Sequence, residues 1–109
     1  MIEYGVWRQA GEGIRRKIFP PGQSIMSMAI EFQAGASGAA HSHPHEQITH
    51  VVGGRLALTV NGIVYEIGAG EQLYVPGGAV HSVEALEDSL VLEIFTPLRE
   101  DLLASITEH

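Results

Sequence analysis

Short apolar runs, separated by glycine and proline at intervals of about ten residues, set the pattern of this chain. The runs predict strands at residues 14–19, 25–32, 48–52, 55–60, 63–67, 72–75, 80–86 and 90–95. Asn61-Gly62 separates two of these runs and favours a type I′ hairpin, because both central residues of that turn need positive φ. The rhythm is typical of an all-β sandwich or barrel.

The two ends of the chain break this rhythm. Residues 1–13 are expected to form an arm with Trp7 as its aromatic anchor. From Pro97 onward the apolar positions take helical spacing, which predicts a short C-terminal helix with Pro97 in its first turn. The apolar positions of that helix are Leu98, Leu102, Leu103 and Ile106. Residues 1–109 show no linker or repeat, so we expect a single domain.

Composition narrows the class of protein. Hydrophobic residues make up 45% and charged residues 17%, as in a globular chain. The formal charge is −7, and Arg15-Arg16-Lys17 is more typical of a solvated strand face or salt-bridge partner, so no nucleic-acid partner is expected. Neither a membrane-spanning run nor the pattern of a signal peptide is visible, so the expected location is cytoplasmic, without a membrane partner. The absence of cysteine limits any transition-metal site to N and O ligands.

Side chains that could bind a metal ion are concentrated just before the strand at 48–52. His41, His43 and Gln47 can all offer lone pairs to a divalent metal. Residues i and i+2 of a strand point to the same face, so these side chains are expected to share a face and His50 to lie on the other.

Two neighbours of these residues have less clear roles. Pro44 disturbs the strand pattern, so the direction of His45 stays open, and a loop position in solvent or beside the ligands is favoured. Glu46 is a rival carboxylate ligand, but its position in the alternation opposes that of the two histidines, so Gln47 is preferred.

The spacing of two glycine-bounded segments resembles the paired motifs of the cupin superfamily. In the first segment, residues 35–54, Gly35 is followed by five residues, His41-x-His43, three residues, Gln47, six residues and a glycine. The second segment, residues 70–85, has the pattern Gly-x5-Pro-x-Gly-x2-His and ends on Ala85 where the motif has Asn. The resemblance implies a jelly-roll β-barrel, the double-stranded β-helix.

The same resemblance implies a metal site. Its ligands would be His41, His43, Gln47 and His81, with Gln47 standing where most cupins have Glu. Three imidazoles and one amide oxygen form a neutral set that holds the ion less tightly than a carboxylate set would. They leave two positions for water or substrate and more positive charge on the ion, which makes it a stronger Lewis acid. The candidate ions are Fe, Mn, Ni, Co and Zn.

A narrower resemblance involves both ends of the chain. The segments RRKI at 15–18, HSHPHEQI at 41–48 and FTPLRED at 95–101 resemble the pectin-degradation cupins of the KdgF type. That family opens 4,5-unsaturated uronate monosaccharides from pectin or alginate to the linear keto form. This chain departs from its pattern at Glu93, where Asp is usual, and at His50, where Tyr is common.

The narrower resemblance implies an isomerase-like enzyme that acts on a small acidic sugar. Arg99 would pair with the substrate carboxylate, Phe95 would line the substrate site, and Glu93 would move protons. On the residues alone, Glu93 could equally be a solvated edge residue, although it shares a face with Phe95. The family and the apolar outer positions Ile48 and Val52 suggest a homodimer.

Two other functions remain open for such a protein. One is a metal-dependent dioxygenase, which would use the same histidines and require iron and oxygen. The other is a non-catalytic cupin that binds a small ligand and forms no product.

Overall fold

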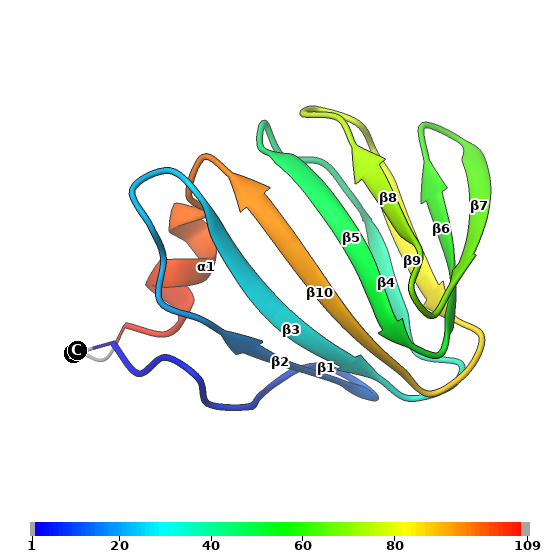
Figure 1. Ribbon diagram of the computed structural model, residues 1–109, viewed down its shortest axis with the longest axis horizontal. Helices are drawn as coiled ribbons and strands as arrows, with labels where there is room; N and C mark the ends of the chain where they lie inside the picture. Colours follow the sequence, from blue (N-terminus) through cyan, green and yellow to red (C-terminus); the bar gives the residue numbers. More distant parts are fainter. Residues whose placement is uncertain (1, 108–109) are drawn as a thin grey trace.

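The computed structural model describes residues 2–107. In this range ten strands and one short helix follow one another along the chain (Figure 1). They are β1 (Arg8–Gly11), β2 (Ile14–Ile18), β3 (Met26–Phe32), β4 (Ser37–His41), β5 (Glu46–Gly53), β6 (Arg55–Val60), β7 (Ile63–Gly68), β8 (Gln72–Val75), β9 (His81–Ala85), β10 (Ser89–Thr96) and α1 (Glu100–Ser105).

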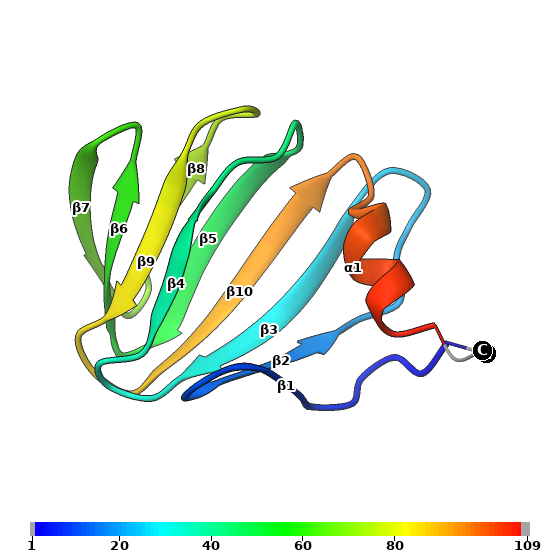
Figure 2. The same cartoon turned by 180° about the vertical axis from the view of Figure 1, so that it is seen from behind.

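The strands form two antiparallel sheets that face each other. The larger sheet has the order β1-β2-β3-β10-β5-β8, and the smaller has the order β4-β9-β6-β7. In Figure 2 the smaller sheet and α1 lie in front of the larger sheet, so both cover its inner face. This is the jelly-roll architecture that the sequence predicts, with a short C-terminal helix.

Alternating apolar side chains fill the space between the sheets. On β6, Leu56, Leu58 and Val60 are buried while Ala57 and Thr59 are partly exposed, which is the period-two pattern of a strand with one inner face. Burying one such leucine side chain stabilises the fold by about 1.5–3 kcal/mol. The inner positions of β3, β5 and β10 follow the same pattern, and their polar members form the site described below.

The hairpin prediction is confirmed and the prediction of an arm is wrong in part. Asn61 has a φ of 48° and Gly62 a φ of 81°, as a type I′ turn requires. Within the predicted arm, however, residues 8–11 form β1, which pairs with β2. The sequence RQAG has no alternating apolar pattern because this edge strand is mostly exposed. Trp7 serves as the expected anchor: its ring lies 4.7 Å from Lys17 Nζ.

The C-terminal helix also starts later than expected. It begins at Glu100, after Arg99 as its N-cap residue, and not near Pro97. Pro97 instead follows a cis peptide bond in the turn that leads out of β10. The expected apolar positions Leu102 and Leu103 are buried against the core. With six residues, α1 is too short to cross a membrane, and no other helix occurs in residues 2–107 that could.

Candidate metal centre and cavity

Three histidines meet at the end of the barrel where the two motifs come together. His41 ends β4 and pairs in register with His81, the first residue of β9, so their rings lie 4.4 Å apart between centroids. His43 follows in the loop after β4, and its ring centroid lies 5.0 Å from that of His81. One ligand atom from each of the three residues lies within 4.8 Å of the others. This group could hold a metal ion.

The expected reason for the convergence of His41 and His43 is wrong. The strand β4 ends at His41, so the alternation of a strand does not fix the direction of His43. The loop is held by the second motif: the Gly78 N–H donates to the His43 carbonyl oxygen at 2.8 Å. A Cβ atom on Gly77 would lie 2.5 Å from the Pro44 carbonyl oxygen, so only glycine allows this close approach of the two loops.

Backbone carbonyls fix the tautomer of all three imidazoles. Each Nδ1 faces a carbonyl oxygen and therefore carries the proton, because a carbonyl can only accept. The pairs are His41 with Ala39 at 3.1 Å, His43 with His45 at 3.2 Å, and His81 with Ala79 at 2.9 Å. The Nε2 atoms are thereby left as lone-pair donors, the arrangement that metal-binding histidines have.

The protonation of the histidines also suits a metal. Burial lowers the pKa of His43 and of His81 below the usual range, with nearby positive charge from Arg99 adding to the effect, so both rings are neutral at neutral pH. The buried His81 Nε2 has no hydrogen-bond partner within residues 2–107. A buried acceptor without a donor is costly, and a bound cation would satisfy it. The residues present therefore fit a divalent metal.

The other candidates near the motif do not belong to this group of ligand atoms, although the His45 ring lies 5.4 Å from that of His43 between centroids. His45 Nε2 is 3.1 Å from the Leu98 carbonyl oxygen and joins the loop to the segment that leads into α1. Glu46 is exposed and accepts a hydrogen bond from the Tyr74 hydroxyl at 2.7 Å. His50 lies on the outer face of the sheet, as expected, with Nδ1 3.2 Å from Gln72 Oε1.

A row of polar side chains extends from the histidines across the inner face of the larger sheet. Gln47 on β5 is 3% exposed, and its Nε2 donates to Thr49 Oγ1 at 2.9 Å and to Glu93 Oε2 at 2.6 Å. The same amide therefore turns Oε1 toward His43, with 3.0 Å between this oxygen and His43 Nε2. Thr49 was missed in the sequence, although its position two residues after Gln47 places it on the inner face.

Glu93 points into the barrel and does not lie on a solvated edge. It sits on β10 opposite Thr49 of β5, and β10 is flanked by β3 and β5. Burial raises the pKa of Glu93 from 4.5 to about 7, against the Thr49 hydrogen bond and the positive charges of Arg99 and Arg16, which lower it. A carboxyl group with this pKa can both accept and release a proton near neutral pH.

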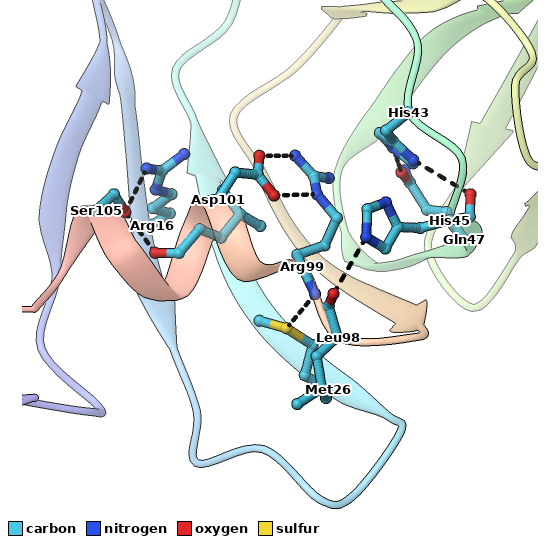
Figure 3. A network of polar contacts seen from close by, with 10 residues as sticks. Arg16, Met26, His43, His45, Gln47, Leu98, Arg99, Asp101 and Ser105 are labelled. Carbon is cyan, nitrogen blue, oxygen red and sulfur yellow. Dashed lines mark hydrogen bonds and ion pairs between the residues drawn. The ribbon is translucent and has the colours of Figure 1, made fainter.

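Arg99 lines the cavity together with Glu93 and points toward Asp101 (Figure 3), whereas Phe95 lies behind Arg99 and is not among the residues that line the cavity. Arg99 is 8% exposed, and its Cζ lies 4.9 Å from the centroid of the Phe95 ring. Its Nε and Nη2 donate to the two carboxylate oxygens of Asp101 at 3.0 and 2.8 Å. This bidentate bond holds the pKa of Asp101 at about 2. No sequence pattern indicates this pairing. Arg99 lies in the irregular segment before α1, and Asp101 lies in the first turn of that helix.

The polar groups line a cavity of about 180 Å³ between the sheets. It is lined by His41 and His81 at one side, by Gln47, Thr49 and Glu93 along the larger sheet, and by Arg16 and Arg99 toward α1. Apolar residues such as Met28, Leu58 and Val91 form the rest of the wall. A small, mainly apolar cavity with a few convergent polar groups is typical of a small-molecule site. Arg16 was not among the expected site residues.

Comparison with known proteins agrees with this geometry. The family described as "Cupin domain" matches residues 28–96. The pectin degradation protein KdgF of Dickeya dadantii is 31% identical over 99 residues, which is 89% of this chain and 90% of that protein.

Solved structures give the same result. KdgF from Halomonas sp. superposes with a TM-score of 0.85 at 32% identity, covering 93% of this chain and 98% of that one. An RmlC-like cupin from Shewanella frigidimarina has a TM-score of 0.85 at 28% identity, with 90% and 88% covered. With the paired motifs, the jelly roll and the convergent histidines, these likenesses show that the chain belongs to the cupin superfamily and is a homologue of KdgF.

Proposed function

We propose that this protein is a metal-dependent enzyme that opens the ring of 4,5-unsaturated uronate monosaccharides and yields the linear keto form. The observation that carries the proposal is the position of Glu93. Its carboxyl group, with a pKa raised to about 7, lies 2.6 Å from Gln47, which adjoins the histidine group. Arg99 lines the same cavity. The likeness to a pectin degradation protein supports a uronate as the substrate.

The metal would be held by His41, His43, His81 and Gln47. The contact between His43 Nε2 and Gln47 Oε1 supports Gln47 as the fourth ligand, because two lone-pair donors 3.0 Å apart need a cation or proton between them. Neighbouring ligands at about 2.1 Å from one ion have roughly this separation. Fe, Mn, Ni, Co and Zn all suit such N and O ligands. When bound, the ion supplies Lewis-acid polarisation of the substrate oxygens.

The proton transfers would belong to Glu93. Ring opening breaks the C1–O5 bond of the cyclic hemiacetal, the anomeric hydroxyl loses its proton to leave an aldehyde at C1, and O5 leaves with the bonding electrons as an enolate oxygen on C5. Glu93 would take the hydroxyl proton and deliver it to C4, so the enolate becomes a ketone at C5 and no atom is gained or lost overall. A carboxyl group with a pKa of about 7 is suited to act in both directions.

Arg99 and Phe95 would position the substrate for this transfer. The guanidinium of Arg99 can donate to the uronate carboxylate through the N–H groups that Asp101 does not use. Phe95 is 1% exposed and lies two residues after Glu93 on β10, so it would add an apolar neighbour that helps to keep water from the carboxyl group.

The test is the loss of the ultraviolet absorbance of a 4,5-unsaturated uronate in the presence of the metal-loaded protein. We expect the absorbance to fall faster with the wild type than without protein. Removal of the metal by a chelator should abolish this acceleration. Glu93→Gln should reduce kcat by about 10²- to 10⁴-fold. Arg99→Ala should raise KM by about 10- to 100-fold, the value of a lost hydrogen bond to a charged group.

The matched control is Glu66→Gln, an exposed carboxylate on β7, which should leave turnover unchanged. Full turnover in both Glu93→Gln and Arg99→Ala would refute the assigned roles. No acceleration by a protein shown to contain metal would refute the ring-opening activity. Oxygen uptake would then test the dioxygenase alternative.

A further inference from the structure

One strand of the larger sheet carries a charged side chain on its inner face. The inner positions of β2 are Ile14, Arg16 and Ile18, and the two isoleucines are 8% and 3% exposed. Arg16 lines the cavity between them. Arg15 and Lys17 lie on the outer face, where both pack against the ring of Trp7. Charged residues are rarely placed inside unless they have a partner. The basic triplet is therefore not uniformly a solvated strand face.

The contacts of Arg16 leave most of its guanidinium unused. Its Nη2 donates to Ser105 Oγ on α1 at 3.3 Å (Figure 3). Ser105 Oγ in turn donates to the Leu102 carbonyl oxygen at 2.5 Å. Within residues 2–107, none of the ion pairs includes Arg16. Burial, reinforced by the charge of Arg99, lowers the pKa of Arg16. The charged guanidinium is therefore destabilised by its loss of solvation, and a bound anion would offset this loss.

The second guanidinium of the cavity is already engaged. Asp101 occupies the Nε–Nη2 edge of Arg99, which is one of the two edges that can hold a carboxylate through a pair of bonds. Arg16 and Arg99 both line this end of the cavity. Among the described residues Asp101 forms an ion pair with Arg99, whereas none forms one with Arg16. The Arg16 guanidinium is therefore a cation of the cavity without a bound counter-charge, although the whole chain carries −7.

We propose that Arg16 is a second anion-binding residue of the cavity and that Arg16 and Arg99 together hold the carboxylate of the substrate at the end nearest α1. The identity of that anion as a uronate rests on the proposed function, whereas the binding of a carboxylate by Arg16 does not. Because a carboxylate stays charged throughout ring opening, Arg16 contributes equally to substrate and transition-state binding. It therefore affects KM and the selection of acidic over neutral sugars.

The test compares Arg16→Met with Lys17→Met in the metal-loaded protein. Lys17 lies next to Arg16 but on the outer face of β2, so it is a matched control for the loss of one positive charge. The probe is galacturonate, a saturated uronate, titrated into labelled protein and followed by NMR chemical shifts. Kinetics with a 4,5-unsaturated uronate are measured in parallel.

We expect Arg16→Met to weaken galacturonate binding by about 10- to 100-fold and to raise KM by a similar factor, with kcat changing much less. Lys17→Met should match the wild type, and galactose, which has no carboxylate, should not distinguish wild type from Arg16→Met. Met is flanked by apolar neighbours at this position and should be accommodated. Arg16→Lys keeps the positive charge but lacks the planar guanidinium with its paired N–H donors, so it should lose part of the affinity for galacturonate.

Unchanged galacturonate binding in Arg16→Met would overturn the inference, as would absence of binding to the wild type. If Arg16→Met does not fold, unchanged affinity in Arg16→Lys overturns it instead. A wild type that binds galacturonate through Arg16 but does not open an unsaturated uronate would refute the proposed function and leave this inference standing.

Discussion

At the scale of single residues, Glu93 is the group whose protonation is most altered by the fold. Its pKa is about 7 in the folded protein against 4.5 in an unconstrained chain, so the folded state binds more protons between these two values. The free energy of unfolding therefore falls as pH rises through this window. Below 4.5 both states are protonated, and the contribution of Glu93 no longer changes with pH.

We predict that metal-free wild type loses stability relative to Glu93→Gln as pH rises from 4.5 to about 7. Urea denaturation of the chelated proteins at a series of pH values measures this difference. Glu66→Gln, which changes an exposed carboxylate on β7, serves as the control and should follow the wild type. Parallel stability curves for wild type and Glu93→Gln would contradict the prediction.

The sequence identified some of these residues and not others for a physical reason. The histidines and Gln47 belong to motifs whose spacing is visible in the linear chain. Thr49 could be found from its position two residues after Gln47, and the alternation of Ile14, Arg16 and Ile18 puts Arg16 on the inner face of β2. What the local pattern does not show is that this face belongs to the site. Arg16 lies opposite Ile30 of β3, and β3 in turn pairs with β10, which carries Glu93.

At the scale of elements, the two loops that carry the ligands depend on each other. Gly77, in the loop before β9, lies against the carbonyl of Pro44 in the loop after β4. A Cβ atom added at Gly77 would lie 2.5 Å from that oxygen, which is far below van der Waals contact. A side chain at Gly77 must therefore displace the loop that holds His43.

We predict that Gly77→Ala lowers the free energy of unfolding by about 1–3 kcal/mol, the usual cost of overpacking, and weakens metal binding. Gly53→Ala is the matched control, because an added Cβ there meets no atom within 4 Å and needs no positive φ. Urea denaturation gives the stability, and competition with a chelator gives the metal affinity. Equal metal affinity in Gly77→Ala and wild type would show that the loop tolerates the displacement.

The strands with strong alternation and clear turns were predictable, and the elements without them were not. The ranges 72–75 and 55–60 coincide with β8 and β6. The strand β1 is polar and exposed, so its existence depends on backbone pairing with β2. The start of α1 could not be found from Pro97, because the chain must first turn out of β10 before a helix can form.

At the scale of the whole molecule, the outer face of the larger sheet carries several exposed apolar side chains. Ile25 and Tyr74 are 51% and 52% exposed and line a shallow hollow with Ile48 and Ile94. Val52 on β5 is also exposed, at 47%. A contiguous exposed apolar patch of this kind often marks an interface between proteins. We therefore keep the expectation of a homodimer.

We predict that the wild type gives the mass of a dimer in light scattering at micromolar concentration. Ile25→Glu should shift the protein toward monomer, because it places two carboxylates in a symmetric apolar contact. Ile63→Glu changes a residue of similar exposure, 57%, on the other sheet and should leave the mass unchanged. A monomeric wild type would contradict the prediction.

The place of β10 in the larger sheet has a consequence for synthesis of the protein. It is the last strand of the described chain, yet it fills the position between β3 and β5. Until it emerges from the ribosome, these two strands each have an unpaired edge with apolar side chains beside it. Such edges are templates for pairing with other chains, so a nascent or truncated chain that stops before residue 89 is the form most exposed to aggregation. The segment that closes the larger sheet is thus also the one that brings Glu93 into the cavity.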